Sequence, residues 1–279
     1  MTSQTSHVPQ IELNNGVRIP QFGFGVFTIP AADTAAAVRT AVEAGYRHFD
    51  TAQAYENEEG VGEGIRQSGV PREEIFVTTK LANDAHGHDN AITALEGSLQ
   101  RLELDYVDLY LIHWPLPNQD KYVLTWQGFE ELLRAGKTRA IGVSNFEVEQ
   151  LERLAGESSV VPAVNQIELH PALQQAELRA YHQSRGIATE AWSPLGQGEL
   201  LADPLLSELA GKYGKTAAQI VLRWHLQIGN IVFPKSVTPE RVRENIAVFD
   251  FELADADLAA IGGLEAGRHF GPDPATFRG

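Results

Sequence analysis

The sequence predicts a single (β/α)8 barrel, one domain spanning residues 1–279, with an N-terminal β-hairpin and a C-terminal loop over the barrel mouth. Eight short apolar runs, rich in β-branched and aromatic residues, recur at intervals of roughly 25 to 45 residues, enough for one helix and two loops per repeat. The runs show little polar alternation, as expected of strands covered on both faces. Segments between them carry helical apolar stripes, such as Ile92, Leu95, Leu99 and Leu102.

The elements can be placed in order along the chain. Asn15-Gly16, between two short extended runs, predicts a hairpin that closes the barrel bottom. The eight expected strands follow: residues 22–27, 46–51, 75–80, 107–114, 138–145, 162–169, 187–194 and 230–236. Thr216 is expected to be the N-cap of a helix. The tail after Gly262 contains Gly, Pro and several aromatic residues, and we expect it to fold over the barrel as a loop.

A doubly wound sheet is the competing architecture. Its dinucleotide fingerprint requires G-x-G-x-x-G directly after the first strand, and the sequence has none there. The nearest pattern, Gly60 to Gly64, has a different spacing and is expected at the entrance to a helix. Residues 211–216, GKYGKT, are two residues too short between the glycines for a phosphate loop.

Composition restricts the function classes. With no cysteine, the chain has no disulfides, thiolate zinc sites or cysteine nucleophiles, and we expect no metal site. A net charge of -15 disfavours general binding to nucleic acid or anionic membranes. No apolar run approaches the ~20 residues that span a bilayer, so we expect a cytoplasmic protein, monomeric by default. His86 and His88 are expected to lie in a solvated loop.

Ionisable and polar residues gather where three consecutive strands end. Asp50, with Tyr55 shortly after it, follows the second strand, Lys80 the third and His113 the fourth. The carboxyl ends of barrel strands carry the chemistry in this fold. Taken singly, these residues can be a buried ion pair, a core histidine and a loop aromatic. Together they favour a functional site, because burying so many titratable groups in one place is costly.

Such a cluster suits protonation of a developing alkoxide. A phenol has an ordinary pKa near ~10, and the Lys80 ammonium is expected to lower the pKa of Tyr55. Asp50 would hold Lys80 charged and in place, while His113 would orient the carbonyl oxygen. Since neither cysteine nor a persuasive metal site is present, an organic hydride carrier is the simplest supplement.

A second polar group surrounds a helix start near residue 239. Its cations and hydroxyl suit a phosphate dianion, with Thr238 as the expected cap. The group consists of Lys235, Ser236, Arg241 and Arg243. The alternative is that the arginines pair with Glu240 and Glu244 on a solvated helix.

Six segments resemble the aldo-keto reductase family, specifically the bacterial branch that includes 2,5-diketo-D-gluconate reductases. They are GYRHFDTAQAYENEEGVGEGI, IFVTTKL, DYVDLYLIHWP, AIGVSNF, NQIELHP and WSPLGQG, and the likeness covers essentially the whole chain. The resemblance implies that Tyr55 is the general acid/base, with Lys80 and Asp50 as the partners that tune its pKa. It also implies that His113 orients the substrate.

The resemblance further implies the cofactor NADPH/NADP+. The residues implied to bind it are Ser144, Asn145 and Gln166 at the carboxamide, Trp192 on the nicotinamide ring, Ser193 and Leu195, then Lys235, Ser236 and Arg241 at the 2'-phosphate, and Glu244 and Asn245 towards the adenine. From its residue type alone, Trp192 fits barrel packing equally well.

One departure from the family concerns the substrate. Many relatives read T-K-L-W-N where this chain has Ala82 within TKLAN, so we expect a wider pocket, walled by Phe27, Trp114 and Phe270. Keto-sugar acids, other small dicarbonyls, 2-oxo esters and bulky aldehydes all fit this small-molecule carbonyl class. Two other functions stay open: a Schiff-base aldolase with Lys80 as nucleophile, and a nucleotide-sensing binding protein.

Overall fold

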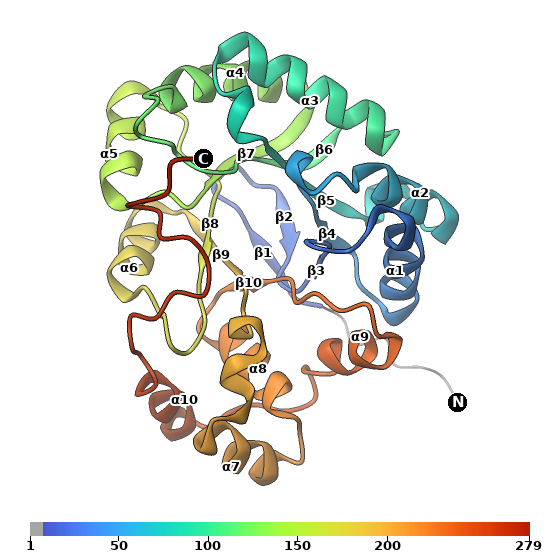
Figure 1. The fold of residues 1–279 in the computed structure, drawn as a ribbon, viewed down its shortest axis with the longest axis vertical. Helices are drawn as coiled ribbons and strands as arrows, with labels where there is room; N and C mark the ends of the chain where they lie inside the picture. Colours follow the sequence, from blue (N-terminus) through green and yellow to red (C-terminus); the bar gives the residue numbers. More distant parts are fainter. Residues whose placement is uncertain (1–7) are drawn as a thin grey trace.

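The structure, a computed structural model, describes residues 8–279 and confirms the predicted barrel. Eight parallel strands are hydrogen-bonded in the order β10-β9-β8-β7-β6-β5-β4-β3. A bridge between Phe22 and Val232, with Gly23 N donating to Val232 O at 2.7 Å, links the two ends of this sheet. Figure 1 shows the helices as a ring around the strands.

All eight predicted barrel strands are present, and all except β5 are shorter than predicted. The strands are β1 (Gln10–Glu12), β2 (Arg18–Pro20), β3 (Phe24–Gly25), β4 (His48–Asp50), β5 (Phe76–Leu81), β6 (Val107–Ile112), β7 (Thr138–Ser144), β8 (Val164–Glu168), β9 (Ala188–Trp192) and β10 (Ile231–Val232). The α-helices are α1 (Ala31–Ala44), α2 (Glu58–Ser68), α3 (His88–Leu102), α4 (Tyr122–Arg134), α5 (Val148–Glu157), α6 (Ala176–Arg185), α7 (Pro204–Tyr213), α8 (Ala217–Gln227), α9 (Pro239–Ile246) and α10 (Asp255–Gly262). The short 3-10 helices are η1 (Gln53–Tyr55), η2 (Arg72–Glu74), η3 (Asn83–Ala85) and η4 (Gly196–Ala202).

The hairpin of β1 and β2 closes the lower end of the barrel. Its strands pair antiparallel and are joined through residues 13–17, a longer connection than Asn15-Gly16 suggested. Gly16 has φ +84°, a left-handed conformation that glycine adopts without strain. Leu13 and Ile19 are buried in a cluster with residues near the lower ends of the barrel strands, among them Phe76, Leu109, Ala140, Val164 and Ile231. The hairpin is therefore a plug of the barrel core.

The three glycines at 60, 62 and 64 serve helix packing. They lie in α2, with Gly60 in its first turn, at the expected helix entrance, and Gly62 and Gly64 further along the helix. A Cβ on Gly62 would lie 2.0 Å from the carbonyl oxygen of Leu102 in α3. One on Gly60 or Gly64 would lie 2.7 Å from side chains of α1. Their lack of a Cβ lets α2 approach both neighbouring helices.

The interior of the barrel changes from apolar to polar along its axis. Alternate residues of a strand face the same side of a sheet. In β5, Phe76 thus belongs to the apolar cluster at the hairpin end, Thr78 accompanies His48 in the middle, and Lys80 lies in the upper layer. The pairing of β8 with β9 places Gln166 beside Glu190. The ionisable layer is therefore set by strand register.

The tail after α10 covers part of the barrel mouth, as predicted. In Figure 1 it runs from α10 past α6 and ends in front of the strands, near β7. Gly271 lies against Trp192, since a Cβ at this glycine would be 2.4 Å from the indole. Further on, the ring centroid of Phe277 is 4.2 Å from that of Trp114.

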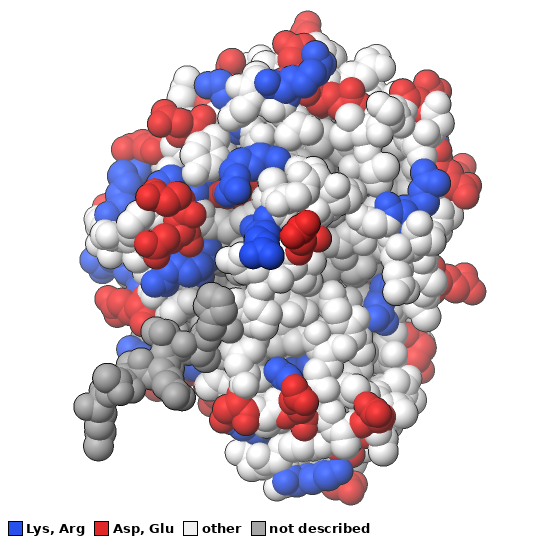
Figure 2. All heavy atoms as spheres, turned by 180° about the vertical axis from the view of Figure 1, so that it is seen from behind, with Lys and Arg blue, Asp and Glu red and all other residues white. Residues whose placement is uncertain are grey.

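The opposite face carries charges of both signs. Figure 2 shows Lys and Arg side chains interspersed with Asp and Glu over this face. Within residues 8–279, no helix is both long and apolar enough to cross a membrane. The same residues contain no group of three or more His, Asp or Glu side chains arranged to hold a metal ion.

Candidate active site

Four residues predicted at consecutive strand ends meet at the barrel mouth. Lys80 Nζ donates hydrogen bonds to Asp50 Oδ1 at 2.6 Å and to Tyr55 Oη at 3.3 Å. The Tyr55 ring lies edge-on to the His113 ring, with centroids 5.8 Å apart. Lys80 is 0% exposed and Asp50 3% exposed, so the ion pair is removed from water. The structure thus joins all four residues in one cluster.

The loop that carries Tyr55 is fixed by buried hydrogen bonds. Thr51 Oγ1 donates to Asn57 Oδ1 at 2.9 Å, and Asn57 Nδ2 donates to Val26 O at 2.9 Å. Lys80 Nζ also donates to Thr51 O at 2.9 Å. These bonds connect the end of β4, the start of α2 and the end of β5. Tyr55 is therefore held over Lys80 by its surroundings and not by one contact alone.

The protonation states follow from burial and the Lys80 charge. Burial alone would lower the pKa of Lys80, but Asp50 and then Tyr55 outweigh it and raise the pKa, so the ammonium persists. Burial, followed by Lys80, lowers the pKa of His113 to about 3, which makes it a neutral imidazole. Burial raises the pKa of Tyr55, and Lys80 opposes that effect without overcoming it. The expected net lowering of the Tyr55 pKa is therefore wrong, although Lys80 acts in the predicted direction.

Asn145 connects three strand ends beside this cluster. Its Nδ2 donates to His113 O at 3.0 Å, and its Oδ1 accepts from Trp192 Nε1 at 2.8 Å. Asn145 has φ +62° and Ser193 has φ +48°, conformations that cost energy for residues other than glycine and cluster at functional sites. Ser144 Oγ donates to the backbone oxygen of Gln166 at 2.8 Å. These candidate cofactor residues form one connected polar network.

The cationic group lies at the N-terminus of α9. Lys235 and Arg241 are exposed, while Ser236 is buried and accepts a hydrogen bond from Thr238 N at 3.1 Å. Thr238 occupies the N-cap position, but its side chain makes no capping bond. The group therefore leaves its cations facing solvent at a helix start.

The alternative pairing of the α9 arginines with neighbouring glutamates is not found. The ion pairs among residues 8–279 include neither Arg241 nor Arg243. Glu244 Oε1 instead accepts from Thr216 Oγ1 at 2.9 Å. Thr216 also caps α8 as predicted, through a capping box with Gln219. Asn245 is buried beside Glu244, on the inner side of α9.

The predicted pocket walls are only partly brought together. Phe27 is 61% exposed and its ring centroid is 4.9 Å from that of Tyr55, so it forms an open rim. Trp114 is covered by Phe277, which the sequence reasoning missed. Phe270 lies against His170, with ring centroids 4.8 Å apart. Leu195, immediately before η4, is partly buried against the core.

Glu168, also missed from the sequence, anchors the tail. Its Oε1 accepts from Phe270 N at 2.7 Å, and its Oε2 accepts from His269 Nδ1 at 3.1 Å. His170 Nε2 lies 3.2 Å from Oε1. Burial would raise the pKa of Glu168, but the hydrogen bonds from His170 and the tail lower it overall. An acid inside the apolar strand PAVNQIEL was the signal that could have identified it.

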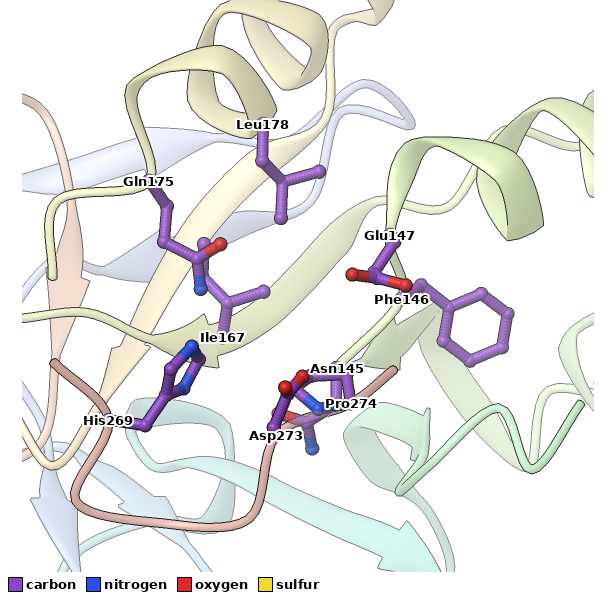
Figure 3. Close-up of a pocket in the computed structure, with 9 residues that line it drawn as sticks. All are labelled: Asn145, Phe146, Glu147, Ile167, Gln175, Leu178, His269, Asp273 and Pro274. Atoms are coloured by element: carbon purple, nitrogen blue, oxygen red, sulfur yellow. The ribbon is translucent and has the colours of Figure 1, made fainter. Parts of the chain in front are cut away.

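A small cavity lies beneath the tail, and Asn145 forms part of its wall. It measures about 70 Å³, and Figure 3 shows Glu147, His269 and Asp273 among the side chains that line it. None of the four residues of the mouth cluster contributes to its wall. The cavity therefore belongs to the packing of the tail against the loops after β7 and β8, and not to the ionisable cluster.

His86 differs from its expected place in a solvated loop. It is buried, and neither of its ring nitrogens has a hydrogen-bond partner among residues 8–279. Burial, followed by Lys121, lowers its pKa to about 4, so it is a neutral core histidine. His88 is the first residue of α3.

The barrel and the buried ionisable cluster at the carboxyl ends of its strands define an enzyme of the (β/α)8 class. The model of the aldo/keto reductase family matches residues 21–266, and the chain belongs to this family. An aldo-keto reductase of Mycolicibacterium smegmatis is 57% identical over 269 residues, which cover 96% of this chain and 98% of that protein.

Two further relatives carry chemical information in their names. A methylglyoxal reductase of Yersinia pestis is 52% identical over 271 residues, 96% of this chain and 97% of that protein. The crystal structure of an aldo-keto reductase of Bombyx mori in complex with NADP superimposes with a TM-score of 0.90 at 42% identity, covering 94% of each chain. The resemblance inferred from the sequence motifs is thereby confirmed at the level of the family.

Proposed function

We propose that this protein is an NADPH-dependent reductase that converts aldehydes and ketones to alcohols, with Tyr55 as the proton donor. The observation that carries the proposal is the contact of the Lys80 ammonium with both Asp50 and Tyr55 at the mouth of a family barrel. When bound, the nicotinamide supplies the hydride. We further propose that the chain acts as a single-domain cytoplasmic monomer.

Each residue of the cluster has a distinct task in this proposal. Tyr55 gives its hydroxyl proton to the carbonyl oxygen as negative charge develops there. The phenolate left behind is stabilised by the Lys80 ammonium, which Asp50 holds in place. His113, being neutral, donates an N–H to the same carbonyl oxygen and so orients the substrate.

The residues present fit the cofactor at both ends. The cations at the start of α9, for which residues 8–279 provide no ion-pair partner, suit the adenosine 2'-phosphate, which is why we propose NADPH over NADH. Towards the barrel axis, Trp192 offers a half-buried aromatic face, and the network of Ser144, Asn145 and Gln166 offers amide groups for a carboxamide. Ser193 and Leu195 lie between the two ends, directly after β9.

The substrate class we propose is a small dicarbonyl, including keto-sugar acids. The similarity to a methylglyoxal reductase supports it. Ala82 leaves the rim beyond Lys80 without a large side chain, and Phe27 is mostly exposed. A rim this open suits small polar carbonyl compounds whose binding depends on hydrogen bonds near Tyr55 and His113.

The aldolase alternative conflicts with the state of Lys80. A Schiff-base lysine must be an accessible neutral amine, whereas Lys80 is 0% exposed and its pKa is raised by Asp50 and Tyr55, which outweigh the effect of burial. No observation in the structure favours the nucleotide-sensing alternative, and measured turnover separates it from a reductase.

Oxidation of NADPH, followed by its absorbance, tests the proposed function directly. A panel of methylglyoxal, a keto-sugar acid, a 2-oxo ester and a bulky aldehyde should show NADPH consumption with at least the small dicarbonyls. Formation of the corresponding alcohol is checked by chromatography. If the protein bound NADPH but consumed none with any compound of the panel, the nucleotide-sensing binding protein would be favoured over the reductase.

Arg241→Ala should discriminate between the two nicotinamide nucleotides. Hydrogen bonds to charged groups are worth about 1.5–3 kcal/mol, so the dissociation constant for NADPH should rise about tenfold or more, while that for NADH stays unchanged. Titration of each nucleotide against protein fluorescence measures both constants. Arg185→Ala, at an exposed arginine in α6, is the matched control. An equal loss for both nucleotides would contradict a role at the 2'-phosphate.

A further inference from the structure

The side-chain amide of Gln166 is shared by two buried carboxyl groups. Its Nε2 donates to Asp50 Oδ2 at 2.9 Å and to Glu190 Oε2 at 2.9 Å. Gln166 and Glu190 are register partners on β8 and β9, so strand pairing fixes this contact. Glu190 is 0% exposed, and its Oε1 has no hydrogen-bond partner within residues 8–279. The reaction proposed above does not use Glu190.

The charges around Glu190 indicate that it holds a proton. Asp50 is already paired with Lys80, the cation of this layer, through its other carboxyl oxygen. A second ionised carboxylate would leave net negative charge in a buried site, which is costly. Burial, and after it Asp50, raise the pKa of Glu190 to about 8, against the opposing effects of Gln166 and Lys80. The unpartnered Oε1 is the oxygen that can carry the proton at least cost.

This arrangement determines how the Gln166 amide is oriented. With both Nε2 hydrogens bound to carboxyl oxygens, the amide cannot rotate without breaking two hydrogen bonds. Its carbonyl Oε1 accepts no hydrogen bond from the described side chains. This oxygen is also absent from the set of buried polar atoms without a partner, so it is not sealed from solvent. Gln166 therefore presents an acceptor to whatever occupies the mouth.

We propose that Glu190 is a positioning residue for the nicotinamide: as a neutral acid it shares the Gln166 amide nitrogen with Asp50 and so presents Gln166 Oε1 to the N–H of the carboxamide. The proposal rests on the proposed function, because it requires a nicotinamide in the barrel mouth. It gives a task to the acid that β9 places beside Gln166 in the barrel interior.

Two substitutions separate positioning from mere packing. Glu190→Gln keeps an uncharged acceptor for Gln166, and its dissociation constant for NADPH should stay close to that of the parent protein. Glu190→Leu keeps the volume but removes the acceptor, so NADPH should bind about tenfold more weakly, the loss expected for one hydrogen bond. Quenching of tryptophan fluorescence by NADPH measures both without turnover. Equal affinity in the parent and Glu190→Leu would overturn the proposal.

The proton is tested on the protein without nucleotide. Because the folded protein holds it more tightly than an unfolded chain, whose glutamate has an ordinary pKa of 4.5, Glu190 lowers stability increasingly as pH rises from 4.5 to about 8. The melting temperature of Glu190→Gln should therefore exceed that of the parent by an amount that widens over this range and then levels. Glu96→Gln, at an exposed glutamate in α3, should show no such widening.

A difference that is constant with pH would refute the neutral acid, even if Glu190→Leu does not fold. Failure of the proposed function is a separate outcome, in which the parent protein itself does not bind NADPH. The stability measurements do not depend on that result.

Discussion

Tyr55→Phe is expected to fold and bind NADPH as the parent protein does, and to lose nearly all carbonyl reduction. Removing a general acid typically costs about 10²–10⁴-fold in kcat, and no other described side chain places a hydroxyl on Lys80 Nζ. A phenylalanine ring preserves the packing of position 55 against Phe27 and His113. Lys80 retains its bonds to Asp50 and Thr51 O, so the cluster should keep its shape.

Tyr106→Phe is the matched control for this loss. Tyr106 is half-buried directly before β6, at the opposite end of that strand from His113, and its ring packs under the Arg72 guanidinium. It should keep full turnover, measured by NADPH absorbance, and both variants should have melting temperatures near that of the parent. Full activity in Tyr55→Phe would remove the proton donor from the proposal.

The sequence predicts those parts of the site that depend on the alternation of side chains along a strand and on the pairing of neighbouring strands. A strand that ends in Asp50, and another that ends in Lys80, bring these residues together in any parallel barrel in which the strands are neighbours. The same alternation that places Phe76 in the lower core places Lys80 at the top. Local patterns of this kind carry enough information to define both the fold and the cluster.

Other features depend on contacts between segments that no local pattern specifies. Besides His170, two residues further on, Glu168 has partners in the tail, which returns to it more than 100 residues later at Phe270 and Gly271. The cover of Trp114 by Phe277 has the same origin. The net direction of the Tyr55 pKa required the degree of burial, which outweighs the nearby ammonium. The helix-packing role of Gly62 likewise required the position of α3.

The network around Lys80 also shows why its charges cannot be altered one at a time. Asp50 accepts from Lys80 with one oxygen and from Gln166 with the other. Burial raises the pKa of Asp50, and Lys80 opposes that shift, so the ion pair depends on both members being present. The stability of the fold and the reactivity of Tyr55 therefore both depend on the Lys80 side chain.

Lys80→Met should be inactive and also less stable by about 3–5 kcal/mol at neutral pH, because it leaves the Asp50 carboxylate buried without its cation. This loss of stability should become smaller as pH falls, because the unpaired Asp50 can then take up a proton. An acid whose pKa is raised in the folded state costs stability only when it is ionised. Urea unfolding at several pH values measures it. Lys137→Met, at an exposed lysine, should change neither stability nor turnover.

Combining Lys80→Met with Asp50→Asn separates the two consequences of losing the ammonium. The double variant removes both charges, so it should recover much of the lost stability, as replacement of whole buried ion pairs often does. It should not recover turnover, because Tyr55 would still have no cation to stabilise its phenolate. If activity returned together with stability, Lys80 would be acting only as a structural partner of Asp50, and the electrostatic task assigned to it would be wrong.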